Sequence, residues 1–217
     1  MTKPAAGGHK KPGRTKAAGR VAAEAVDDER VLAFLNTLSG RPTAAPVERL
    51  QSYDALVDWA QQQHVVSASV AERLQAQARR HPHQAALALT RARDLREALH
   101  ALMAALDAGR EAPPAALDAI SGFVAAAYAH GRLVPHDGAL QWVSSADDEV
   151  DRVGWEIARA AGRLVVSHRL GRVRACAAGD CAWWFVDDTK NRSRRWCDMK
   201  ICGNREKIRR FRKKQGA

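Results

Sequence analysis

The sequence predicts a mainly helical protein whose chain ends in a small cysteine-rich module. Apolar residues recur at helical spacing through residues 27–168, and Pro and Gly divide that stretch into segments of helical length. All four cysteines lie between Cys176 and Cys202. With 217 residues, of which 46% are hydrophobic, the chain is long enough to bury one sizeable core and to carry a small appendage.

The positive charge of the chain is concentrated at its two ends, although the net charge is +11 overall. Residues 1–26 carry six Lys or Arg against one acid, residues 172–217 carry 14 against five, and residues 27–171 carry 15 against 18. Residues 1–26 lack an apolar face, so we expect a disordered basic tail there. Charge placed in this way is typical of a protein that binds a polyanion, and a solvated basic tail is the alternative.

Three helices are expected in the first half of the helical region. The first follows Asp27 and Asp28 and ends at Gly40, the second follows Pro46, and Ser67 caps the third. Their apolar residues have helical spacing and predict the buried faces. These residues are Val31, Leu32, Phe34, Leu35 and Leu38, then Leu50, Tyr53, Leu56, Val57 and Ala60, then Val70, Leu74 and Ala78.

Three more helices and a hairpin complete this region, which we expect to be bundle-like. One helix runs from Pro82 to about Gly109, the next from Pro113 to Gly131, and the last over about 147–168. Residues 133–143 predict a short hairpin that turns at His136, Asp137 and Gly138. The expected apolar stripes are Leu87, Arg91, Leu95, Leu99, Leu102 and Leu106; Leu117, Ile120, Phe123 and Val124; and Val150, Val153, Ile157, Leu164 and Val165.

The spacing of the four cysteines predicts a metal site. Four residues separate Cys176 from Cys181 and Cys197 from Cys202, and fifteen residues separate the two pairs. Two such pairs can surround one ion with sulfur, and a tetrahedral set of four thiolates favours zinc. Four protein ligands leave no position for water, so the single zinc would be structural. Disulfide bonds are the alternative, which a reducing compartment disfavours.

The residues between and behind the cysteine pairs indicate the outline of a zinc finger. Residues 183–186 favour a strand, residues 188–193 a polar turn, and residues 194–196 return towards Cys197. The run after Cys202 is expected to be helical, with Ile208 and Phe211 packed back on the hairpin. A knuckle, a hairpin and a second cysteine pair at the start of a helix form a treble-clef-like zinc finger.

The stretch from Cys176 to Lys214 is similar to the CGNR zinc-finger family. It contains RRWC and then ICGNR, and residues 202–205 are the motif that names the family. Residues 32–37, LAFLNT, resemble the opening of the helical ABATE domain that commonly precedes this finger. The resemblance implies a stress-linked bacterial transcription regulator with a helical domain at 27–168 and a finger at 170–217. The finger would bind DNA, and the helical domain would sense a ligand or partner.

A basic cluster within and behind the finger is the strongest functional signal after the cysteines. Arginine dominates it, and the planar guanidinium suits phosphate and guanine. The expected nucleic-acid-binding residues are Arg192, Arg194, Arg195, Arg205, Lys207, Arg209, Arg210, Arg212, Lys213 and Lys214. A solvated helix face is the alternative. Two further alternatives are that Arg205 braces the hairpin through Asp187 or Asp188, and that the tryptophans stack on bases instead of forming a small core.

Asn36 and Thr37 are polar residues inside an otherwise apolar helix. A buried amide needs hydrogen-bond partners, so Asn36 either organises neighbouring helices or contacts a small-molecule effector in a pocket. The eight histidines are scattered, and the sequence contains no GxxxxGK, dinucleotide, HExxH or GxSxG motif. No enzymatic function is therefore expected.

These features favour a cytoplasmic, DNA-binding transcription regulator. The N-terminal charges precede no apolar segment, and no run reaches the roughly 18 apolar residues of a membrane span, so neither a secretory signal nor a membrane anchor is expected. An RNA-binding protein with the same finger and a zinc-stabilised protein–protein interaction module are the alternatives. One finger offers only a small interface to nucleic acid, so a homodimer that brings two fingers together is plausible.

Overall fold

The structure is a computed structural model that describes residues 26–136, 138–145 and 149–215. The tail expected at residues 1–26 lies outside the described residues, apart from Val26. The described chain begins with a helical segment at 26–35 and is mainly helical, as predicted. In the described ranges, no helix combines the length and the apolar character that crossing a membrane requires.

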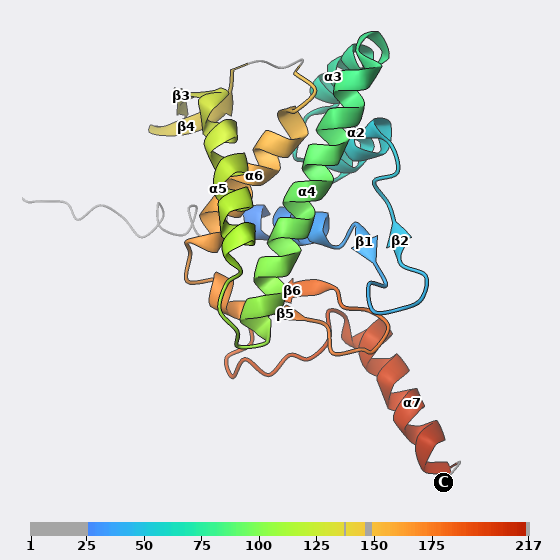
Figure 1. Ribbon diagram of the computed structural model, residues 1–217. Helices are drawn as coiled ribbons and strands as arrows, with labels where there is room; N and C mark the ends of the chain where they lie inside the picture. Colours follow the sequence, from blue (N-terminus) through green and yellow to red (C-terminus); the bar gives the residue numbers. More distant parts are fainter. Residues whose placement is uncertain (1–25, 137, 146–148, 216–217) are drawn as a thin grey trace, which may run out of the picture.

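Five further helices form the body of the molecule (Figure 1). They are α2 (Tyr53–Gln62), α3 (Ala68–Arg80), α4 (Pro82–Asp107), α5 (Pro114–Ala129) and α6 (Arg152–Val165). The long helix α4 contacts α2 and α3 and also contacts α5 and α6, so it connects the two groups. The local signals set the starts: Ser67 Oγ accepts from the Val70 N–H at 3.4 Å, and Pro82 occupies the first turn of α4.

One continuous core joins these helices. Phe34 and Leu35 from the first helical segment, Leu56 from α2, Leu99 from α4 and Ile157 from α6 are each at most 1% exposed. The expected stripe on α4 is wrong at both ends, where Leu87 and Leu106 are exposed. Arg91, also expected on that stripe, pairs at the surface with Asp151 at 2.7 Å. Leu117 at the start of α5 is exposed as well.

Two antiparallel strand pairs accompany the helices. The predicted hairpin is present as β3 (Gly131–His136) and β4 (Ala139–Ser144), with Gly138 at φ +73°, while Asp137 lies outside the described residues. A second pair, β1 (Leu38–Ser39) and β2 (Val47–Glu48), was not predicted, and it takes Leu38 out of the first helix. Arg96, buried on α4, holds this pair in place by donating to the Thr37 hydroxyl at 2.9 Å and to the Glu48 carboxylate at 2.8 Å.

The last part of the chain begins beside the C-terminal end of α4, where the Ala175 N–H donates to the Asp107 carboxylate. A short turn of 3₁₀ helix, η1 (Leu170–Arg172), leads into β5 (Val173–Ala175), which pairs with β6 (Trp184–Val186); a turn of π-helix, η2 (Met199–Gly203), then leads into α7 (Asn204–Gln215). The strand expected at 183–186 therefore pairs with the strand before Cys176, and residues 194–196 do not form the returning strand that we expected.

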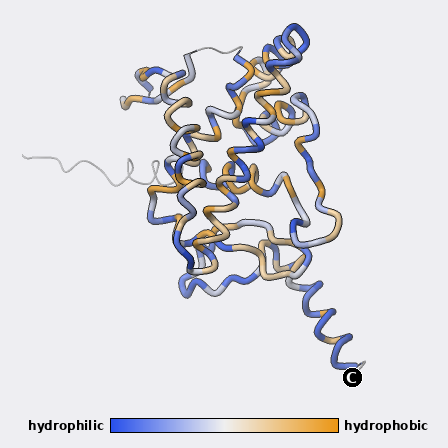
Figure 2. Tube along the Cα trace, in the orientation of Figure 1, coloured by the Kyte–Doolittle hydropathy of each residue, from blue (hydrophilic) through white to orange (hydrophobic). Residues whose placement is uncertain are grey.

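Helix α7 extends away from the rest of the molecule, and most of it is hydrophilic (Figures 1 and 2). None of its residues is buried. The prediction that Ile208 and Phe211 pack back on the hairpin is wrong, because their exposed fractions are 51% and 59%. The axis of α7 leads away from the hairpin, so Ile208 and Phe211 do not reach it.

Candidate metal centre and nucleic-acid interface

The local structure of the finger brings the four cysteines together. Cys176 follows β5, and its N–H donates to the Trp183 carbonyl at 2.8 Å, which closes the β5–β6 hairpin next to the first knuckle, residues 176–181. Cys181 ends a turn in which its N–H donates to the Ala178 carbonyl at 3.1 Å. Cys202 lies in η2 just before α7. Backbone hydrogen bonds thus hold Cys176 and Cys181, and the turn η2 places Cys202.

The four sulfurs fit a tetrahedral zinc ion. All four Sγ atoms lie within 4.8 Å of one another, and the Sγ atoms of Cys181 and Cys202 are each 3.7 Å from that of Cys197. Zn–S bonds of about 2.3 Å in a tetrahedron place sulfurs about 3.8 Å apart, whereas a disulfide requires about 2.05 Å. Burial, together with the negative charge of Cys176 and Cys181, raises the pKa of Cys197. A divalent cation removes that penalty, since it stabilises all four thiolates.

The second cysteine pair is built on a helix start. The Asp198 carboxylate accepts from the Ile201 N–H at 2.8 Å, and its carbonyl accepts from the Cys202 N–H at 3.0 Å. Asp198 is therefore the capping residue. Asn204 donates its side-chain amide to the Lys200 carbonyl at 3.0 Å and so braces this turn.

Asp180, in the first knuckle, anchors α7. Its carboxylate pairs with Arg205 at 2.8 Å and with Arg209 at 2.6 Å. Arg205 also donates to the Cys202 sulfur at 3.4 Å. Arg205 thus pairs with Asp180, not with the two aspartates of the hairpin that we considered. The pair holds a positive charge beside the four thiolates and connects the first knuckle to the helix.

Asp187 organises the polar turn of the finger. Its buried carboxylate accepts from the Thr189 N–H at 2.9 Å and from the Arg194 N–H at 2.9 Å. Burial raises the pKa of Asp187, but these hydrogen bonds and the Thr189 hydroxyl more than offset that effect and leave it lowered. The Arg194 guanidinium lies 4.6 Å from the centre of the Phe185 ring and donates to the Trp196 carbonyl at 2.9 Å. Arg194 therefore has a clear structural role.

The structure divides the ten expected nucleic-acid-binding residues into three groups. Arg194, Arg205 and Arg209 are engaged within the finger as described above, and the Arg195 guanidinium lies 5.4 Å from the centre of the Trp196 ring. Arg192 is exposed in the polar turn at φ +50°. The other five lie on α7, are exposed, and form no ion pair within the described residues. They are Lys207, Arg210, Arg212, Lys213 and Lys214.

The finger is docked on the helical region through Trp184. The Asn36 side chain accepts from the Trp184 N–H at 2.8 Å and donates to its carbonyl at 3.0 Å. The Trp184 indole donates to His100 Nδ1 at 3.1 Å, and Trp184 as a whole is 4% exposed within the main core. Burial, followed by the charge of Arg41, lowers the pKa of His100 to about 4, which keeps its imidazole neutral and able to accept. Trp184 is therefore a core residue.

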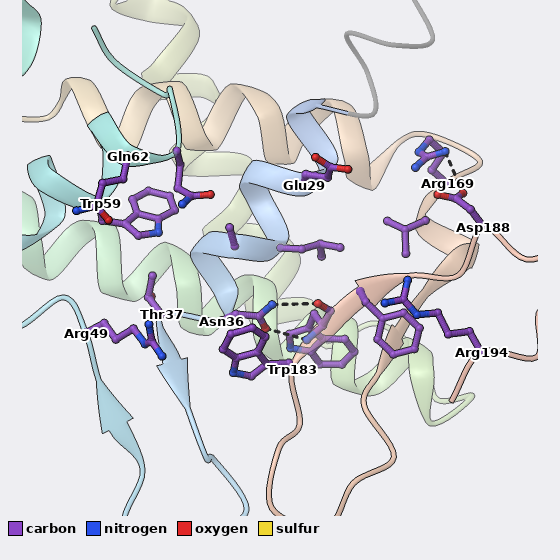
Figure 3. A pocket seen from close by; sticks show the side chains of 16 residues that line it. Glu29, Asn36, Thr37, Arg49, Trp59, Gln62, Arg169, Trp183, Asp188 and Arg194 are labelled. Atoms are coloured by element: carbon purple, nitrogen blue, oxygen red, sulfur yellow. Dashed lines mark hydrogen bonds and ion pairs between the residues drawn. The ribbon is translucent and has the colours of Figure 1, made fainter. Parts of the chain in front are cut away.

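A pocket of about 510 Å³ lies beside this contact, between the first helical segment, α2 and β6 (Figure 3). The helical region contributes Asn36, Thr37 and Trp59 to its walls, and the finger contributes Trp183 and Arg194. The Thr37 hydroxyl is already paired, since it donates to the Phe34 carbonyl at 2.6 Å and accepts from Arg96. The two residues proposed from the sequence thus lie together at one pocket, with their polar groups engaged inside the protein.

Three contacts of the site were missed by the sequence analysis. They are Asp180 with the arginines of α7, His100 with Trp184, and an ion pair between Asp28 and Arg169. The position of Asp180 next to Cys181 is a signal, because a carboxylate beside a ligand in a basic finger invites an ion pair. The other two pairs join residues 84 and 141 positions apart, and nothing local indicates them.

Two family models match the chain. Residues 28–168 match ABATE, which is described as "Putative stress-induced transcription regulator", and residues 172–215 match the CGNR zinc finger. Neither description is that of an enzyme, and no curated protein matches the chain. The four-cysteine cluster lies inside the second match, which supports one zinc ion as its metal. Because the first match covers more than half of the chain, the protein belongs to the ABATE family and carries a CGNR zinc finger behind that domain.

Proposed function

We propose that the protein regulates transcription by binding DNA with its finger and α7, while the helical domain responds to a small-molecule effector or a partner in stress. The observation that carries the proposal is the charge of α7: five cations without an acidic partner within the described residues, on a helix that extends beside the four cysteines. By contrast, residues 27–171 have more acidic than basic side chains. A polyanion would therefore meet the molecule at α7.

The engaged arginines have a complementary role in this proposal. Arg205 and Arg209 fix α7 on the knuckle, and Arg194 fixes the polar turn, so the zinc cluster would set the angle at which α7 meets DNA. The free cations and Arg192 then contact phosphates. Phosphate contacts position a protein on the duplex, and they make binding strongly dependent on salt.

Competition at matched salt tests the choice of nucleic acid. The full-length zinc protein is bound to a labelled duplex and challenged with unlabelled duplex DNA or with a structured RNA of the same length. We expect the DNA to compete better, because the major groove of A-form RNA is too deep and narrow for a helix. Stronger competition by RNA would support the RNA-binding alternative. Negligible affinity for both at moderate salt would favour the protein-interaction module.

The pocket beside Asn36 and Thr37 is our proposed effector site. Both the helical domain and the finger form its walls, so an occupant would bind with an affinity that depends on how the finger is docked. By linkage, the same occupant would change the affinity of the finger for DNA. Asn36 would act here by holding β6 in place as one wall of the pocket, since both hydrogen bonds of its amide go to the backbone of Trp184.

A substitution that fills the pocket tests this coupling without a known effector. Ala33 lines the pocket, so Ala33→Leu places a larger side chain in it. We expect this variant to bind DNA with an altered dissociation constant. The matched control is Ala125→Leu, on the exposed face of α5, which should bind like the wild type. Equal affinities for all three proteins would argue against an effector role for the pocket.

A further inference from the structure

Helix α7 has an anchored side and a free side. Arg205 and Arg209 are one turn apart and point to Asp180 in the first knuckle, so they define the anchored side. The free side consists of positions 204, 207, 208, 211 and 214, which follow the spacing of a single helix face. Its centre lies about a third of a turn around the helix from Arg205 and Arg209. Because the anchor fixes the rotation of α7 about its own axis, it determines which residues face outward.

The free side combines apolar and basic side chains. Ile208 and Phe211, one turn apart, are 51% and 59% exposed. Lys207 and Lys214 lie along one edge of this apolar pair, and Arg212 lies near the other edge, so cations border it. Exposed Ile and Phe side chains on so hydrophilic a helix indicate a partner surface that is apolar in the middle and negative at its borders.

The major groove of duplex DNA has both properties. Phosphates line its two rims, and the 5-methyl group of thymine projects into it as an apolar patch. At 12 residues α7 is about 18 Å long, and a helix about 10–12 Å across fits a groove about 12 Å wide. A second copy of α7 fits poorly, because each copy carries seven cations against the single acidic residue Glu206 and the two would repel.

We propose that α7 enters the major groove with its free side towards the bases, so that Ile208 and Phe211 contact thymine methyl groups and select T·A base pairs. This inference rests on the proposed DNA binding and adds the reading face and the base. Lys207 and Lys214 meet phosphates on one rim and Arg212 on the other. Arg205 and Arg209 position the helix and read no base, in contrast to the guanine contact that arginines in a finger commonly suggest.

Replacing thymine by uracil in the DNA tests the proposal, because it removes only the methyl group. A preferred site is first selected from random duplexes by the full-length zinc protein, and each thymine in it is then replaced by deoxyuridine. We expect the wild type to lose about fourfold in affinity for each methyl group contacted, which corresponds to the burial of one carbon. Ile208→Ala and Phe211→Ala should bind the thymine site more weakly than the wild type. In each variant, replacing the one thymine that the lost side chain contacted by deoxyuridine should then cause no further loss of affinity.

Two controls separate this inference from the proposed function. Lys213→Ala, which lies off the free side, should weaken binding to both DNAs equally, and zinc content and circular dichroism should be unchanged in all variants because these side chains are exposed. Equal binding of thymine and uracil sites by the wild type overturns the inference while DNA binding stands. A Phe211→Ala variant that converts a dimer to a monomer in sedimentation overturns it in favour of self-association. Failure to select any duplex removes the proposed function, and this inference with it.

Discussion

Replacing Asn36 with Ala removes both hydrogen bonds between its side-chain amide and the backbone of Trp184, at 2.8 and 3.0 Å. Each such bond contributes about 0.5–1.5 kcal/mol, and a buried backbone group left without a partner costs a further 1–3 kcal/mol or so. Water reaches this partly buried contact to some extent, so we expect a total loss of about 2–3 kcal/mol in the free energy of unfolding. That is a large share of the stability of a typical domain.

Urea unfolding followed by far-ultraviolet circular dichroism measures this loss. Zinc content is determined in parallel, and we expect it to stay at one ion per chain because the ligands are the four cysteines, whereas the Asn36 amide bonds to Trp184. Gln62→Ala is the matched control, since Gln62 lines the same pocket and is exposed, so its loss should stay within about 0.5 kcal/mol. A loss below about 0.5 kcal/mol for Asn36→Ala would refute the role of Asn36 in docking the finger.

Three further predictions follow from the site. Cys197→Ser should abolish zinc binding, measured by elemental analysis after dialysis, because its sulfur contacts two others in the cluster; full retention of zinc would contradict the four-thiolate site. Asp180→Asn frees Arg205 and Arg209, so the affinity for random DNA should rise and the slope of log affinity against log salt should steepen by about one to two units. Asp188→Asn makes the same charge change and should have a smaller effect. Identical behaviour of the two variants would argue that Asp180 does not anchor α7. The pKa of His100 is lower in the folded protein than in the unfolded chain, so His100 contributes stability above about pH 6.5 that is lost as the pH falls towards 4. The loss is at most about 1.4 kcal/mol per pH unit, and less because this site is only partly buried. The free energy of unfolding should depend less on pH in His100→Gln across this range, and equal slopes would contradict the role of His100.

Local patterns predicted most of the helices. Ser67 and Pro82 act on the turns in which they lie, so their effect is visible in the sequence alone. The burial of a helix end depends on how far its neighbours extend, and for this reason Leu87 and Leu106 were placed wrongly. The β1–β2 pair depends on Arg96, whose partner Glu48 is 48 residues away.

The metal centre was predictable and the docking contact was not. The cysteines come in two pairs of fixed spacing, and each pair forms its half of the site locally. Asn36 and Trp184 are 148 positions apart, so only the folded chain joins them. The exposed position of Phe211 has a similar cause, because it follows from the direction in which Asp180 holds α7.

The salt dependence of duplex binding shows whether α7 is the surface that binds DNA. The dissociation constant is measured at several salt concentrations for the wild type and for a variant with Lys207, Arg210, Arg212 and Lys214 replaced by Ala. If these four contact phosphates, the slope of log affinity against log salt should be flatter in the variant by about 3–4 units. Equal slopes, in a variant that keeps its zinc and its helical content, would show that DNA binds to another surface of the protein.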